Sequence, residues 1–300
     1  MIIQEYLERL KNNRGYSLNT IKNYGRTMEL FKNYMKLNKR SIEDTRKIKL
    51  NVIENFIARQ RENKDVRTCN NYLACIKLFL RFCLVKWYKT EDYNKILFAR
   101  EPRKKIDALE NGDMEKMIDY LKNLRPTTKY WDLIRVRNLL ILQLLFYTGL
   151  RISELINIKV EDVGEEMQIL GKGNKIRTIN LYDDDLRLIH LYLFMRRKFD
   201  SEYLFISFSG NAINKKITAV SVEKYVRDIA KAVGITYRVF PHKIRHTFAT
   251  NLLRCKAPLP HIQELLGHNS IITTQHYLTV LNSELRDTQK ILHKNFKIKI

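Results

Sequence analysis

The sequence predicts a mainly α-helical protein with one small β-sheet. Three observations lead to this fold class. Apolar residues recur at spacings of three and four along most of the chain, one short stretch changes to a period of two, and turn-forming residues are scarce. With only 10 Gly and 5 Pro among 300 residues, a long low-complexity linker is excluded. A chain of this length typically folds into about two domains.

The first hundred residues predict a compact unit of about four helices. The first helix begins with Tyr6, Leu7 and Leu10 and ends at an Asn-Asn-Arg-Gly turn. Ser17 is a favourable N-cap for the second, because its side-chain oxygen can accept a backbone N–H of the first turn. The apolar positions that continue this pattern are Ile21, Tyr24, Met28, Phe31 and Tyr34 in the second helix, Val52, Phe56 and Ile57 in the third, and Tyr72, Ile76, Phe79, Leu80 and Cys83 in the fourth.

A short basic stretch at residues 100–105 contains the first proline of the chain and marks a boundary. We therefore expect an N-terminal domain over residues 1–98, a basic linker over 99–107 and a second domain over 108–300. The second domain opens with a helix at 114–121 and a continuous apolar run at 139–147, which is typical of a buried helix.

A change of period to two predicts a β-hairpin between residues 167 and 181. Ile169 leads into the turn Gly-Lys-Gly-Asn, and Ile176, Ile179 and Leu181 follow it. Beyond the hairpin, apolar residues return to helical spacing. The helices predicted there cover residues 186–197, 220–233, 242–254, 262–266 and 281–293.

The charge balance indicates a polyanionic partner. The chain has 55 Lys and Arg against 32 Asp and Glu, a formal net charge of +23. Two basic blocks, with 22 basic and 10 acidic residues in 1–100 and 15 and 6 in 201–300, flank a middle with 18 and 16. Nucleic acid or an anionic membrane would attract such a charge. No apolar stretch approaches the ~20 residues of a membrane span, which favours nucleic acid.

Location and metal content follow from what the sequence lacks. The N-terminus has neither the basic region nor the apolar core of a signal peptide. The four cysteines have no metal-site spacing and are consistent with reduced thiols. His242 and His246 stand one helical turn apart, but no Glu lies between them as the H-E-x-x-H zinc motif requires. We expect a cytoplasmic protein without a structural metal.

Short motifs follow one another along the second domain. Residues 148–155 read T-G-L-R-I-S-E-L, the hairpin turn carries Lys172, and a proline-led segment reads P-H-K-I-R-H from residue 241. L-L-G-H then ends at His268, nine residues before Tyr277. Each motif alone has an ordinary structural explanation. Arg151 and Glu154, for example, have the i, i+3 spacing of a surface ion pair.

Together, these motifs resemble those of the tyrosine recombinases, the superfamily of the phage integrases and Xer proteins. The resemblance covers the second domain and extends more loosely to the first, which is similar to a helical core-binding domain. It implies that this domain and a mixed catalytic domain form a C-shaped clamp around double-stranded DNA. It also implies that no ATP or metal cofactor is needed. The implied catalytic residues are Arg151, Lys172, His242, Arg245, His268 and Tyr277.

The chemistry of these residue types suits metal-free cleavage of a DNA phosphodiester. Arginine binds two phosphate oxygens through its planar fork, which fits Arg151 and Arg245. A tyrosine nucleophile, here Tyr277, forms a covalent 3′-phosphotyrosine that conserves the bond energy for religation. The resemblance further implies that Lys172 protonates the leaving 5′-oxygen. It leaves His242 to accept the tyrosine proton or to hydrogen-bond that hydroxyl, while His268 donates to the phosphate.

Several assignments stay open. Lys175 and Arg177 compete with Lys172 for the role of acid and are otherwise candidates for DNA-backbone contacts. Arg103, Lys104 and Lys105 fit a solvated linker as well as a DNA contact. The resemblance implies strand exchange through a Holliday junction by a homotetramer, in which the helix at 281–293 docks on a neighbouring subunit or packs on its own domain. Two alternatives are an enzyme of similar chemistry that relaxes supercoils or resolves hairpin ends, and a non-catalytic DNA-binding regulator.

Overall fold

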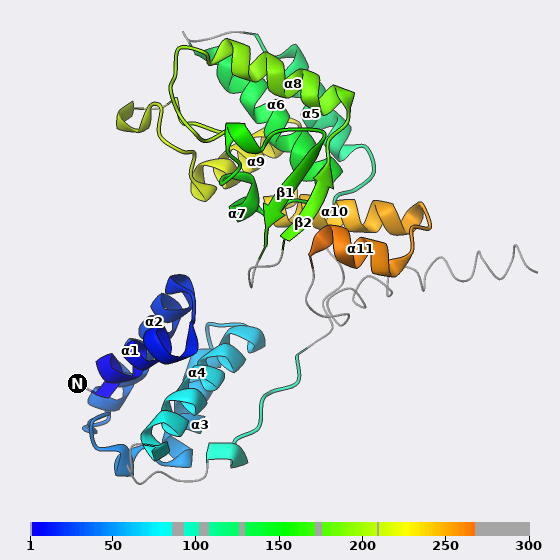
Figure 1. The fold of residues 1–300 in the computed structure, drawn as a ribbon. Helices are drawn as coiled ribbons and strands as arrows, with labels where there is room; N and C mark the ends of the chain where they lie inside the picture. The colour runs from blue at the N-terminus through cyan, green and yellow to red at the C-terminus, as the bar shows by residue number, and fades with distance from the viewer. Residues whose placement is uncertain are drawn as a thin grey trace, which may run out of the picture. The chain divides into compact units, whose positions relative to one another are not determined.

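The computed structural model describes two compact units, Met1–Lys104 and Lys105–Ile300 (Figure 1). The described residues are 2–85, 93–101, 108–125, 130–171, 176–208 and 210–267. The predictions that lie outside these ranges concern Arg103, Lys104, Lys105, Lys172, Lys175, His268, Tyr277 and the helix at 281–293.

The first unit contains the four predicted helices around one apolar core. Ser17 is the N-cap of the second, as predicted, and its Oγ accepts the backbone N–H of Thr20 at 3.2 Å. Aromatic rings fill the centre, where Phe31 and Phe56 meet edge to face with centroids 5.1 Å apart. The elements are α1 (Ile2–Arg14), α2 (Leu18–Leu37), a 3-10 helix (Thr45–Lys47), α3 (Leu50–Arg61), α4 (Val66–Val85) and a 3-10 helix (Tyr93–Lys95).

The second unit is built around a buried central helix, α6 (Trp131–Thr148), which packs against α5, α8 and α10 (Figure 1). Its described residues form a mainly helical fold with one two-stranded antiparallel sheet, so the predicted fold class is confirmed. The other elements are α5 (Asp113–Asn123), α7 (Ile152–Leu155), β1 (Glu166–Leu170), β2 (Ile176–Asn180), α8 (Asp183–Met195), α9 (Ala219–Ala232), α10 (Pro241–Arg254) and α11 (Leu259–Leu266), with 3-10 helices at Val160–Asp162 and Gly210–Ala212.

Helix α6 begins eight residues before the apolar run that predicted it. Its first two turns contain charged and polar residues, and two of them, Arg137 and Asn138, are buried. Arg137 donates to Asn138 Oδ1 and to the carbonyl of Ile206, and its guanidinium lies 4.7 Å from the ring centroid of Tyr225. The contacts with Ile206 and Tyr225 come from distant segments, so the apolar run by itself did not show that these polar residues are buried.

The hairpin corrects one sequence prediction. Residues 167 and 169 of β1 and 177 and 179 of β2 face the interior, and Ile169 pairs with Arg177 in the register. Ile176, predicted to continue the apolar period of the strand, is 63% exposed. Strict alternation places Arg177 on the same face as Ile179, so an arginine occupies the inward position that the prediction gave to an isoleucine.

Across the part of the chain that the structure describes, no helix combines the length and apolar character needed to cross a membrane.

Candidate functional site

The predicted catalytic residues that the structure describes are Arg151, His242 and Arg245, and they belong to one site. The turn after α6 carries Arg151, and α10 carries the other two. Arg151 donates to the carbonyl of Gly267 at 2.9 Å, and Arg245 donates to the carbonyl of Leu266. Both guanidiniums therefore meet at the C-terminal end of α11, directly before His268 in the sequence.

Arg151 is the N-cap of the one-turn helix α7, and Glu154 binds both its backbone N–H and its side chain. The Glu154 carboxylate accepts the backbone N–H of Arg151 at 2.8 Å and its Nη1 at 2.8 Å. Leu150 and Leu155 on either side are buried in the core and anchor the turn. The Arg151 side chain stays 28% exposed, so a phosphate can reach a guanidinium that is already oriented.

Glu154 is shared between two arginines. Its Oε1 also accepts Nη1 of Arg177 at 2.9 Å, and its Oε2 accepts Nη2 of Arg177 at 2.6 Å. Burial raises the pKa of Glu154, but the hydrogen bonds from Arg177 and Arg151 outweigh it and lower the pKa to about 2. The carboxylate is therefore ionised at neutral pH.

Arg245 is buried, with only 1% of its surface exposed. Its position follows from α10, which begins at Pro241, a residue favoured in the first helical turn. In addition to its bond with Leu266, Arg245 donates through Nη1 to the carbonyl of Gly149, the C-cap of α6. Backbone groups of two helix ends thus fix this guanidinium.

His242 lies on α10 one turn before His246, and their ring centroids are 4.5 Å apart. Although His242 is exposed, partial desolvation lowers its pKa, and the positive charges of Arg245 and Arg151 lower it further. Its imidazole is therefore neutral at neutral pH and can accept a proton. The described residues hold no cluster of His, Cys, Asp and Glu that could bind a metal ion.

Arg177 does not lie where a DNA-backbone contact requires it. Its side chain is 7% exposed, and both terminal nitrogens bind Glu154. The sequence prediction named Arg177 as a candidate phosphate contact, and its pairing with a carboxylate, in contrast to the neutral carbonyls that Arg245 contacts, disfavours that role. Sequence reasoning missed the Arg177–Glu154 pair, although the period-two spacing of Arg177 with Ile179 and Leu181 was a signal that all three share one face of the strand.

Gly149 belongs to the site, although the sequence analysis gave this residue of the T-G-L-R-I-S-E-L motif no role. Its φ of +60° ends α6 in the left-handed conformation, and a Cβ built there would lie 2.3 Å from Cδ1 of Phe248. This close approach brings α6 against α10 and places the Gly149 carbonyl on Arg245.

We expect Gly149→Ala to destabilise the second unit by about 1–3 kcal/mol, because the alanine is strained at positive φ and overlaps a buried ring. Thermal unfolding followed by circular dichroism measures this. Gly210→Ala is the matched control, since Gly210 also has positive φ (+48°) but no atom within 4 Å of the added Cβ. Equal midpoints for the two variants would show that the contact with Phe248 has no energetic importance.

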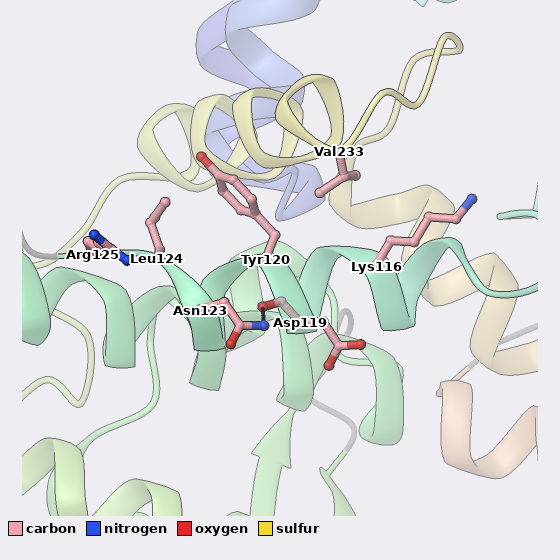
Figure 2. Close-up of a pocket in the computed structure, with 7 residues that line it drawn as sticks. All are labelled: Lys116, Asp119, Tyr120, Asn123, Leu124, Arg125 and Val233. Atoms are coloured by element: carbon pink, nitrogen blue, oxygen red, sulfur yellow. Dashed lines mark hydrogen bonds between the residues drawn. The ribbon is translucent and has the colours of Figure 1, made fainter.

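A separate pocket of about 440 Å³ lies between α5 and the end of α9 (Figure 2). Tyr120 projects from α5 towards the segment that carries Val233, and Asn123 donates to the Asp119 carbonyl at 2.9 Å. None of the predicted catalytic residues lines it. Its lining residues are Lys116, Asp119, Tyr120, Asn123, Leu124, Arg125 and Val233.

The geometry of the described site suits an anionic ligand. Arg151 and Arg177 both pair with the carboxylate of Glu154, and Arg245 adds a third positive charge at the end of α11. Because Arg177 and Glu154 neutralise each other, the charge of Arg151 remains for a ligand on the exposed side. Two arginines converging on one point are typical of phosphate recognition.

Two family models match this chain. The model of the phage integrase family matches residues 107–284, and that of the phage integrase N-terminal SAM-like domain matches residues 3–86. The tyrosine recombinase XerD of Listeria innocua serovar 6a is 30% identical over 303 residues, which cover 97% of this chain and 98% of the relative. The XerD of Staphylococcus saprophyticus is 30% identical over 302 residues with the same coverage.

Solved structures share the fold. The XerH site-specific recombinase bound to a palindromic difH substrate, a post-cleavage complex, aligns with a TM-score of 0.75 and 22% identity over 97% of this chain and 85% of that one. A lambda integrase dimer bound to a COC′ core site aligns with a TM-score of 0.71 and 16% identity over 92% and 93%. The chain therefore belongs to the phage integrase family of site-specific tyrosine recombinases.

Proposed function

We propose that this recombinase cuts and rejoins double-stranded DNA through a 3′-phosphotyrosyl intermediate on Tyr277. The observation that carries the proposal is the convergence of Arg151 and Arg245 on the end of α11. His268 follows directly in the sequence, and Tyr277 follows nine residues later. A phosphate held by the two arginines would thus be bound beside the segment that leads to the nucleophile.

In the proposed reaction, the Tyr277 hydroxyl oxygen attacks phosphorus and its proton passes to His242, whose lowered pKa keeps it neutral. The bond from phosphorus to the 5′-oxygen breaks, and Lys172 protonates that oxygen. Arg151 and Arg245 stabilise the charge that grows on the non-bridging oxygens, and His268 donates to them. Attack by a 5′-hydroxyl of a second strand reverses these steps and restores tyrosine.

Each transesterification conserves one phosphodiester, so we propose that the reaction needs neither ATP nor a metal ion. Exchange between two sites requires four cleavages and passes through a Holliday junction, and a homotetramer supplies the four tyrosines. We propose that residues 281–293 link neighbouring subunits, that residues 1–98 and 108–300 grip the DNA as two domains, and that the protein acts in the cytoplasm. The complexes of XerH and lambda integrase with DNA support DNA as the partner.

Covalent capture on DNA tests the proposal. Wild-type protein is incubated with a pool of random-sequence duplexes. Each duplex carries a nick, so that the short strand released by cleavage diffuses away and cannot be rejoined. DNA that stays attached to the protein after boiling in detergent is recovered. We expect a protein–DNA adduct, with the peptide containing Tyr277 joined to a 3′-phosphate in mass spectrometry. Absence of any adduct, or a link through another side chain, would contradict the proposed function. The recovered sequence then provides a defined substrate.

We expect DNA affinity to fall steeply with salt. Each phosphate contact contributes a slope of about −0.9 to the plot of log affinity against log salt, since it releases condensed counterions. Residues 1–98 belong to the more basic block, so a fragment of residues 108–300 should show a weaker affinity and a shallower slope. Fluorescence anisotropy on the captured duplex measures both. Equal slopes for the fragment and the full chain would rule out the N-terminal domain as a DNA-backbone contact.

The cleavage rate should decline at a lower pH than it would with a histidine of ordinary pKa as the proton acceptor. A free imidazole is half protonated at about pH 6.5. Because the folded-state pKa of His242 is below that value, it remains a proton acceptor as the pH falls through 6.5, and the rate declines only below it. Single-turnover rates between pH 5 and 8 measure the acid limb. His242→Gln, which accepts a hydrogen bond but no proton, should lose that limb; an unchanged limb would assign it to another group.

A further inference from the structure

Arg177 closes a ring of contacts around the candidate site. It binds both oxygens of Glu154, and the same carboxylate binds Arg151. Arg151 then donates to the carbonyl of Gly267 at 2.9 Å. Gly267 returns to Arg177, because a Cβ built on Gly267 would lie 3.1 Å from Nη1 of Arg177. The ring joins β2, α7 and the end of α11, three elements that are separate in the sequence.

In this ring, Glu154 shares its negative charge between Arg177 and Arg151. Four hydrogen bonds reach its two oxygens, two from each arginine residue. With Arg177 in place, its positive charge balances the buried carboxylate, and Arg151 can present its own charge to an anion. Without Arg177, the carboxylate would draw Arg151 inward as its single cationic partner in this ring. Its pKa would also rise, because burial would then be opposed by fewer hydrogen bonds.

Arg177 reaches the reaction only through these neighbours. Its side chain is 7% exposed and both terminal nitrogens bind Glu154, so they are not available to a ligand on the open side of Arg151. Glycine at position 267 leaves the space that the Arg177 guanidinium fills. An arginine at this point therefore supports the backbone directly before His268 as well as the carboxylate that holds Arg151.

We propose that Arg177 is a positioning residue for DNA cleavage: by neutralising and orienting Glu154, it keeps Arg151 available for the scissile phosphate. The inference rests on the proposed function, since Arg151 is assigned there to the phosphate. It replaces the DNA-backbone contact that the sequence predicted for Arg177.

The test compares Arg177→Met, Arg177→Lys, Glu154→Gln and the double variant Arg177→Met/Glu154→Gln on the nicked duplex captured by the wild type. Single-turnover adduct formation is measured from pH 5 to 8, and DNA affinity is measured at several salt concentrations. Arg196→Met is the matched control. Arg196 is also buried and donates to the carbonyls of Ser201, Tyr203 and Leu204, outside the ring.

For Arg177→Met we expect cleavage to be about 100-fold slower, as for other small displacements of a catalytic group. DNA affinity and its salt slope should stay at wild-type values. The pKa of Glu154 is raised in this variant, so the rate at the acid end of the range should fall by more than in the wild type. Arg177→Lys keeps the charge without the fork and should recover part of the rate and most of the wild-type pH profile. Arg196→Met should lower the melting temperature and leave the pH profile unchanged.

The double variant separates positioning from direct contact. If Arg177 acts through Glu154, Arg177→Met costs little more once Glu154 is Gln, so the two effects do not multiply. Multiplying effects, or a salt slope shallower by about 0.9 for Arg177→Met, would identify a phosphate contact and overturn the inference. A wild-type rate and pH profile in Arg177→Met would also overturn the inference, while the proposed function would stand. If the wild-type protein itself forms no adduct, both the proposed function and the inference are wrong. If Arg177→Met does not fold, Arg177→Lys decides: slower cleavage at unchanged affinity supports positioning, and a wild-type rate refutes it.

Discussion

Tyr277→Phe is expected to abolish covalent capture of DNA while leaving DNA binding intact. The substitution removes one hydroxyl group, which in the proposed reaction is the attacking atom, and phenylalanine has no nucleophile to replace it. The loss should reach the detection limit, at least four orders of magnitude below the wild type if the residual catalysis follows other nucleophile deletions. Detergent-resistant adducts on the captured nicked duplex measure it, and anisotropy on the same duplex confirms binding.

Lys172→Ala provides the contrast, because it affects the leaving group and not the attacker. When the bridging 5′-oxygen is replaced by sulfur, the leaving thiolate needs no proton, so Lys172→Ala should regain most of its rate. Tyr277→Phe should remain inactive on that substrate. If sulfur does not rescue Lys172→Ala, Lys175 becomes the first alternative for the acid. An adduct formed by Tyr277→Phe would instead refute the assignment of the nucleophile.

The helical framework could be predicted because it depends on local pattern. Ser17 caps α2 as expected, and the hairpin occurs where the period changes to two. The prediction for α6 was less complete, since its first two turns also contain charged and polar residues, two of which, Arg137 and Asn138, are buried through contacts such as that of Arg137 with the Ile206 carbonyl. A pattern along the chain records apolar positions, but it does not record which polar groups find distant partners.

The same limit applies to the site. The motif around Arg151 included Glu154, and the i, i+3 ion pair that was the structural alternative for these residues is present at 2.8 Å, with Glu154 buried. The third member, Arg177, lies 23 residues further on in the sequence, and folding brings its side chain to the Glu154 carboxylate. Its chemistry favours either a phosphate or a carboxylate partner, so residue type alone could not decide between them. Burial of this face of the strand decides in favour of the carboxylate.

Arg151→Ala and Arg245→Ala are expected to slow cleavage by at least about two orders of magnitude each, the cost of removing one donor from a site that stabilises a charged transition state. DNA affinity should change little, because each residue is one of many positive charges on a chain with a net charge of +23. Single-turnover adduct formation and anisotropy on the captured duplex measure the two quantities. Lysine at either position should restore only part of the rate, since one ammonium does not reproduce a bidentate fork.

The two variants should differ in stability, and this difference tests the geometry of the site. Arg151→Ala leaves Glu154 paired with Arg177, so its unfolding midpoint should stay near that of the wild type. Arg245→Ala leaves the carbonyls of Gly149 and Leu266 without the donor they have in the structure, at a cost of about 1–3 kcal/mol for each buried group. Its melting temperature should therefore fall. If either alanine variant cleaves DNA at nearly the wild-type rate, the assignment of that arginine to the scissile phosphate is wrong. If the two variants are equally stable, Arg245 does not support the ends of α6 and α11.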